Sequence, residues 1–384
     1  MSTYSSNRSV LYWSESGGAK TSQISYLARR TWREHRKRTR VISADGGSLD
    51  PLKPEIEMGL IEPFVLPPID GKTIAIFRKL SLGFWPNIAK LNEEHKLVLL
   101  PPSVETYREF GMLAWDGVTA VADRIFRDFQ NSGMRLGGDG ASAVVEQEIE
   151  LELPFAVKPN PAVSGKEKIY AATQSMYLFT QKEVRMLIDN SNTLPFQRTY
   201  WTALESKGEE IVGRDTIYGP MLVGSAATSK VPAWFGDCFH GELMFQPKLD
   251  HQKKVVVDEK TKAPILEKSI RVYYNDHQDP KTGFKYKAKP RVPPHLYGEL
   301  EKKFPGGYFD LTPAEGIDKF LDFEDELFAR SGQDLQKLDF DLEKFRVELG
   351  KGRPTQVAVG PQPVPPASTT ATASVPPKPA VQSK

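Results

Sequence analysis

Residues 10–21 decide the fold, and they read VLYW followed by SESGGAKT. The apolar residues 10–13 have the composition of a buried strand, whereas residues 20–38 follow a helical pattern. Between them lies a short turn that contains the pair Gly17-Gly18, which supplies backbone freedom. We therefore predict a strand, a tight turn and a helix in immediate succession.

A turn in this position has the context of a phosphate-binding loop, because its backbone N–H groups and the helix N-terminus both favour an anion. The pattern G-x-x-x-x-G-K-[ST] is matched at Lys20 and Thr21, while Ser14 and Ala19 replace its glycines. Lys20 would reach the β- and γ-phosphates, and the Thr21 hydroxyl would ligate Mg²⁺. A chance strand–turn–helix is the alternative. The predicted nucleotide-binding residues of the loop are Ser16, Gly17, Gly18, Ala19, Lys20, Thr21 and Ser22.

A second element supports the loop. Residues 110–115 form an apolar strand that ends in Asp116, and residues 118–130 follow as an amphipathic helix. This is the pattern of a Walker B strand, whose carboxylate faces the phosphate loop and helps to hold Mg²⁺. The alternative is an aspartate that caps the helix. The order of the two elements favours a metal site made of Thr21 and Asp116.

Composition places the chain among soluble globular proteins. Hydrophobic residues make up 39% and charged residues 26% of its 384 residues, which excludes a wholly disordered or membrane-embedded chain. The single cysteine, Cys238, excludes a disulfide framework, and with six histidines it argues against a Cys/His zinc site. Neither an apolar run of membrane-spanning length nor the apolar core of a signal peptide is present, so we expect a cytoplasmic protein.

Short apolar runs alternate with helical patterns over about the first 300 residues, which predicts an α/β fold. Residues 131–165 are rich in Gly and Pro and read as a small insertion. Residues 312–349 predict two amphipathic helices separated at Ser331-Gly332. Residues 351–384, rich in Pro, Ala, Ser and Thr, predict a disordered tail.

Charge is uneven along the chain although the net charge is only +2. Residues 29–40 and 281–291 are basic, and residues 318–348 are largely acidic. Basic clusters can follow a phosphate backbone, although a charge run is more often a solvated face. In this respect the sequence leaves both interpretations open.

With these pieces in order, the chain resembles the phage-encoded RecA-like ATPases, the AAA-type P-loop group associated with single-strand annealing and recombination. The motifs that carry the likeness are SESGGAKT, VISADGG, GMLAWDGVTAVADRIF, RTYWTALE, GPMLVGSAATSKVPAWFGDCFHGEL and RVYYNDHQDPKTGFKYKAKPR. The resemblance implies a RecA-like P-loop NTPase core with a mainly parallel sheet over residues 1–295, including the insertion. A helical C-terminal region over residues 296–350 and the tail would follow.

The resemblance also implies roles for residues outside the loop. Asp45 would polarise the attacking water, although a turn-forming aspartate is the alternative. Thr202 and Glu205 would sense the γ-phosphate, and Glu205 is a second candidate for positioning the water. Arg291, with neighbouring lysines, would reach the nucleotide of an adjacent subunit and stabilise charge there.

The expected function is that of a Mg²⁺- and ATP-binding, DNA-dependent ATPase in recombination, annealing or replication. Single-stranded DNA would lie on a basic face of a homo-oligomeric ring or filament, in the host cytoplasm if the chain is phage-encoded. Because both loop glycines are replaced, a nucleotide-binding scaffold without hydrolysis is the first alternative, and a P-loop kinase of another class is the second.

Overall fold

The computed structural model describes residues 8–44, 49–66, 73–87, 97–132, 148–150, 168–170, 174–207, 216–248, 250, 252, 254–312 and 315–337. The chain divides into two compact units, residues 1–328 and 329–384. The described part of the second unit is limited to residues 329–337. The predicted tail and most of the predicted insertion lie outside the described residues.

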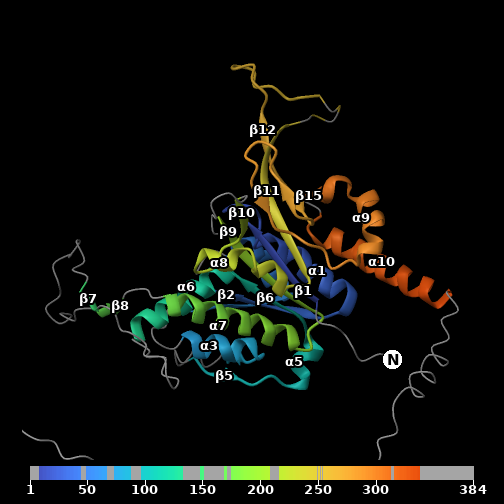
Figure 1. The fold of residues 1–384 in the computed structure, drawn as a ribbon. Helices are drawn as coiled ribbons and strands as arrows, with labels where there is room; N and C mark the ends of the chain where they lie inside the picture. The colour runs from blue at the N-terminus through green and yellow to red at the C-terminus, as the bar shows by residue number, and fades with distance from the viewer. Residues whose placement is uncertain are drawn as a thin grey trace, which may run out of the picture. The chain divides into compact units, whose positions relative to one another are not determined.

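A mainly parallel sheet forms the centre of the first unit (Figure 1). Its parallel strands are, in order across the sheet, β3 (Ile61–Val65), β2 (Arg38–Ser43), β6 (Phe110–Asp116), β9 (Arg198–Lys207), β1 (Arg8–Ser14) and β11 (Asp237–Pro247). The strand that leads into the glycine turn, β1, is therefore separated from the strand that ends in Asp116, β6, by β9 alone. Both carboxyl ends lie at the same edge of the sheet.

Antiparallel strands extend the sheet at two places. Beyond β11 come β12 (Leu266–Tyr273) and then β15 (Tyr308–Asp310). The end of β9 pairs with β10 (Ile217–Pro220), which leads to β14 (Lys285–Tyr286) and β13 (His277–Gln278). Two small separate sheets consist of β4 (Trp85–Pro86) with β5 (Leu99–Leu100) and of β7 (Glu148–Glu150) with β8 (Lys168–Tyr170).

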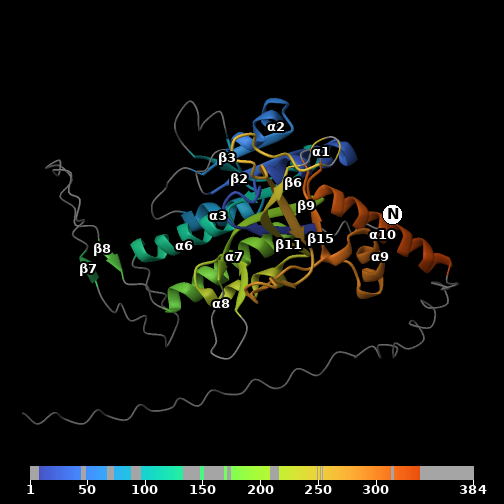
Figure 2. The same cartoon turned by 90° about the horizontal axis from the view of Figure 1, so that it is seen from above.

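Helices cover both faces of the sheet (Figures 1 and 2). They are α1 (Ser22–His35), α2 (Lys53–Glu57), α3 (Thr73–Ser81), α5 (Val104–Glu109), α6 (Val118–Ser132), α7 (Gln174–Thr193), α8 (Ser225–Thr228), α9 (Tyr297–Lys303) and α10 (Asp318–Lys337). Short 3₁₀ turns occur at Asp50–Leu52, Val231–Trp234, Pro294–Leu296 and Pro305–Gly307. Within the described parts of the chain, none of the helices has the length and apolarity that crossing a bilayer would require.

The core consists of two apolar layers, one on each side of the sheet, because side chains alternate along a strand. On one side, Val10 and Tyr12 of β1 pack with residues of α1 and the first half of α10. On the other side, Leu11 and Trp13 pack with residues of α3, α6 and α7. Trp13, Trp115 and Trp201 are fully buried and therefore belong to the core.

The predicted α/β fold class is confirmed: a mainly parallel sheet is flanked by helices. One expectation is wrong. The break predicted at Ser331-Gly332 is absent, since α10 runs through it to Lys337. A single glycine lowers helix propensity by only about 1 kcal/mol relative to alanine, which the flanking helix formers offset.

Candidate phosphate-binding site

The turn between β1 and α1 has a backbone that few residue types can adopt. A Cβ atom on Gly18 would lie 2.2 Å from Oγ and 2.6 Å from Cβ of Ser14, so the side chain at position 14 fills the room that Gly18 leaves. Ala19 stands at a glycine position of the strict pattern and has a φ of 56°, the left-handed region. The turn therefore keeps the glycine-like conformation at position 19 with an alanine, at a cost of about 1–2 kcal/mol.

Two buried tyrosines beneath the turn hold its carbonyl groups. The Tyr12 hydroxyl donates to the Gly18 carbonyl at 3.0 Å, and the Tyr200 hydroxyl donates to the Lys20 carbonyl at 3.1 Å. Burial raises the pKa of both tyrosines above its usual value, so both hydroxyls stay protonated donors. Because C=O and N–H point in opposite directions across a trans peptide, the N–H groups of Ala19 and Thr21 are directed away from the tyrosines. Sequence analysis assigned both tyrosines to strands and missed this role.

Lys20 lies directly before Thr21, the N-cap residue of α1, and its ammonium group folds back onto the loop. Its Nζ atom donates to the Ser14 carbonyl at 3.2 Å, to Ser14 Oγ at 3.3 Å and to the Glu15 carbonyl at 2.6 Å. The helix N-terminus itself has no side-chain cap. The N–H groups of Gln23 and Ile24 donate to carbonyls of the preceding turn, and the helix dipole places a partial positive charge at the same point.

The carboxylate of Asp116 lies directly beside this helix start. The Thr21 hydroxyl donates to Asp116 Oδ2 at 2.9 Å, and the Thr202 hydroxyl donates to Asp116 Oδ1 at 2.8 Å. Thr202 in turn accepts from the Gly117 N–H at 2.6 Å, which fixes its position. Three strands and one helix thus bring together Thr21, Asp116 and Thr202, although Thr21 and Thr202 are 181 positions apart in sequence.

These side chains suit a magnesium ion that is shared with a phosphate. A hydroxyl and a carboxylate are hard oxygen ligands, and Mg²⁺ is usually held by one or two carboxylates together with substrate phosphates. Among the residues that the structure describes, no cluster of three or more His, Cys, Asp or Glu side chains could hold a metal. The donors around Asp116 therefore fit a nucleotide-borne Mg²⁺ better than a metal caged by protein alone.

A cleft of about 660 Å³ opens above the loop. One wall consists of Ser16, Gly17, Ala19, Lys20, Thr21 and Ser22. The opposite wall comes from β12, with Lys268 and Ile270, and from Leu311 at the end of β15. The rest of the lining consists of Gln23 and Tyr26 of α1, Pro51, Leu204 of β9, Ser269 of β12 and Thr312. A cleft of this size with one polar, cationic end and one apolar end suits a nucleotide.

The remaining predicted residues lie in different places. Asp45 is outside the described residues. Glu205 is bonded to His240, with 3.1 Å between Oε2 and Nε2, and strand alternation puts it on the opposite side of β9 from Thr202. Arg291 donates its N–H to Asp237 at the first residue of β11, the end of the parallel sheet away from the loop. Within one chain, therefore, Arg291 does not reach the loop.

Cys238 and His240 lie two residues apart on β11. Cys238 is fully buried, and burial raises the pKa of its thiol. The ring of His240 stacks on Trp13 with 4.1 Å between centroids and contacts His277, with 3.3 Å between ring nitrogens. Cys238 is therefore a core residue.

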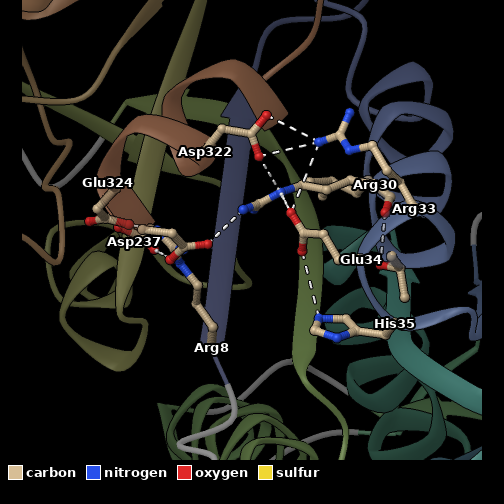
Figure 3. Close-up of polar contacts among 11 residues, drawn as sticks. Arg8, Arg30, Arg33, Glu34, His35, Asp237, Asp322 and Glu324 are labelled. Atoms are coloured by element: carbon tan, nitrogen blue, oxygen red, sulfur yellow. Dashed lines mark hydrogen bonds and ion pairs between the residues drawn. The ribbon is translucent and has the colours of Figure 1, made fainter. Parts of the chain in front are cut away.

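The basic stretch 29–40 is partly exposed, and several of its arginines pair with acidic side chains. Arg30 pairs with Asp322 at 2.7 Å and with Asp325 at 2.6 Å, both from α10 (Figure 3). Arg33 pairs with Asp322 at 3.1 Å. Farther along, Arg38 pairs with Glu109, and Arg40 lies over the rings of Trp85 and Phe110. Acidic residues of α10 thus pair with two arginines of this basic segment.

Comparisons with known proteins give limited information. No model of a known family matches the chain, and no curated protein matches it. Among solved structures, a KaiC-like protein from the hyperthermophilic archaeon Pyrococcus horikoshii is similar over 73% of this chain and 89% of its own, with 10% sequence identity and a TM-score of 0.28. What the loop of this chain can bind follows from its own residues.

Proposed function

We propose that the chain binds ATP with Mg²⁺ at residues 14–22 and acts as a RecA-like P-loop ATPase. The observation that carries this proposal is the hydrogen bond between the Thr21 hydroxyl and the Asp116 carboxylate, next to Lys20 and a cleft of nucleotide size. Thr21 and Asp116 are 95 positions apart in sequence, yet their hydroxyl and carboxylate meet at the N-terminus of α1, beside the ammonium group of Lys20. That combination is the one that triphosphate and magnesium together require.

The chain's own groups divide the work of binding. The N–H groups of Ala19 and Thr21, oriented by the two tyrosines, would donate to phosphate oxygens. The ammonium group of Lys20 would leave the loop carbonyls and bind phosphate oxygens instead. Thr21 and Asp116 would hold Mg²⁺, which when bound neutralises charge on the terminal phosphates. Thr202 keeps Asp116 in place from the neighbouring strand.

Hydrolysis additionally needs a group that positions water. Glu205 is occupied by His240, so Asp45 is the candidate that we retain. It directly follows Ala44, whose N–H donates to the Asp116 carbonyl at 3.2 Å, so the chain passes the metal site just before Asp45. We propose Asp45 as the polarising carboxylate and Arg291 as a cation that acts on a neighbouring subunit.

DNA dependence, assembly into a ring or filament, and a role in phage recombination, annealing or replication are further parts of the proposal. The motif resemblance supports them. Arg30 and Arg33 are paired with acidic residues of α10, so we propose residues 281–291 as the first choice for contact with single-stranded DNA. If this segment follows a phosphate backbone, the affinity for DNA will fall steeply between low and physiological salt.

Calorimetric titration with Mg·ATP and turnover assays with and without single-stranded DNA test the proposal. Wild type should bind Mg·ATP, Lys20→Ala should lose most of that affinity, and DNA should raise turnover. DNA-independent phosphoryl transfer to a small acceptor would instead indicate a kinase. Binding without turnover would indicate a nucleotide-binding scaffold, and no binding by wild type would refute the nucleotide site altogether.

A further inference from the structure

One cation in the cleft belongs to neither the loop nor any predicted motif. Lys268 lies on β12, the returning strand of a long hairpin that runs out of the sheet (Figure 1). Residues 246–265 form the outer part of this hairpin, and Lys268 lies at its inner end, opposite Phe245 of β11. The next residues of β12, Ser269 and Ile270, also line the cleft. The hairpin and the nucleotide cleft therefore share a strand.

The ammonium group of Lys268 lies over the middle of the loop. Its Nζ atom is 3.1 Å from the point that a Cβ atom of Gly17 would occupy. Gly17 has a φ of 83°, so this position both needs glycine for its backbone and leaves room for the lysine above it. Lys20 comes from the segment before α1 and Lys268 from β12, and both line the cleft.

Lys268 also differs from nearby basic side chains in what it contacts. Arg271, on the same strand, pairs with Asp310 at 2.9 Å, and Lys287 pairs with Asp276 at 2.6 Å. Lys268 is exposed, and in the part of the chain that the structure describes its side chain forms no hydrogen bond or ion pair. A cation that lies beside this loop and pairs with no carboxylate among the described residues is available to an anion that the protein does not supply.

We propose that Lys268 is a second phosphate-binding cation, supplied by the hairpin of the same chain, and that it couples nucleotide occupancy to the position of β12. The proposal rests on the proposed nucleotide site and names a residue of that site. A triphosphate bound at the loop would contact Lys20 from one wall and Lys268 from the other. Because β12 continues into the outer hairpin, binding of phosphate would restrain the hairpin as well as the loop.

Affinity measurements on three variants test the phosphate contact. Lys268→Met removes the charge but keeps most of the side-chain length, and Lys268→Arg keeps the charge. Lys260→Met is the matched control, because Lys260 is an exposed lysine of the outer hairpin away from the cleft. In calorimetry with Mg·ATP, Lys268→Met should weaken binding about tenfold or more, as expected for a charge-assisted hydrogen bond. Lys268→Arg should retain most of the affinity, and Lys260→Met should match wild type.

Hydrogen exchange provides a readout that a purely structural role would not change. Mg·ATP should slow amide exchange in residues 266–273 of wild type and of Lys260→Met, but not of Lys268→Met. Equal Mg·ATP affinity and equal protection in Lys268→Met and wild type would overturn the proposal while leaving the nucleotide site intact. If wild type itself does not bind Mg·ATP, the proposed function fails, which is a different result. Should Lys268→Met fold poorly, Lys268→Gln takes its place in the same comparison.

Discussion

The geometry of the turn between β1 and α1 predicts that substitutions at Ser14 and Gly18 affect stability jointly, because the two residues are in contact. Gly18→Ala places a methyl group 2.2 Å from Oγ and 2.6 Å from Cβ of Ser14, whereas carbon atoms pack at about 3.5–4.0 Å. Ser14 is fully buried, so its side chain cannot turn into solvent. Overpacking of this kind costs about 1–3 kcal/mol, and here the strain falls on the loop itself. We expect Gly18→Ala to lower stability by about 2 kcal/mol and to weaken Mg·ATP binding.

Ser14→Gly should rescue Gly18→Ala, because it removes both atoms that clash. The nearest atom left is the Glu15 carbonyl oxygen, at 3.3 Å, which a small shift accommodates. Alone, Ser14→Gly loses one contact with Lys20 and adds backbone freedom, so it should cost only about 0.5–1 kcal/mol. The double variant should therefore be about 2 kcal/mol more stable than the sum of the single effects.

Urea unfolding of wild type, the two single variants and the double variant measures this coupling energy, and Mg·ATP titration of the same proteins shows whether the loop recovers. The geometry of the turn is wrong if Gly18→Ala is as stable as wild type. It is equally wrong if the double variant shows the two single effects simply added together.

Other parts of the structure make independent predictions. Arg8→Met should lower the free energy of unfolding by about 3–5 kcal/mol, since it leaves the fully buried Glu324 without its cation, whereas exposed Arg33→Met should change it by less than about 1 kcal/mol in the same urea titration. Burial, with a smaller contribution from His240, lowers the pKa of His277 to about 3. Below about pH 6.5 the imidazole of His277 is therefore protonated in the unfolded chain but stays neutral in the folded chain. The free energy of unfolding should fall from pH 6.5 toward pH 5, and it should fall less in His277→Gln. Asp116→Asn should weaken ATP binding at least about tenfold with Mg²⁺ present but little with EDTA present, and equal loss in both conditions would argue against a metal-holding role.

Local sequence patterns were sufficient for the parts of the site that are local. The strand, turn and helix of residues 10–35 follow from an apolar run, a glycine pair and helical spacing. The strand that ends in Asp116 follows from a similar pattern, and the mainly parallel sheet follows from the alternation of such units. These features depend on residues a few positions apart, so the sequence carries them directly.

Contacts between distant segments could not be predicted in this way. Lys268 is brought to the loop by the pairing of β12 with β11 and of β11 with β1, and no local pattern marks it. The hydroxyl of Tyr200 contacts a carbonyl 180 residues away, while its ring gives an ordinary strand pattern. The pairing of residues 29–40 with α10 could not be predicted, because the acidic partners lie about 290 residues later in the sequence. Charge runs reveal their role only when their partners are known.

A crystal structure of the chain with Mg²⁺ and a non-hydrolysable ATP analogue would test the nucleotide site most directly. We predict phosphate density against the N–H groups of Ala19 and Thr21, within reach of Lys20, with the metal ion between the Thr21 hydroxyl and the Asp116 carboxylate. An analogue bound elsewhere on the chain, or a loop that keeps Lys20 on its own carbonyls while the metal lies away from Asp116, would contradict it.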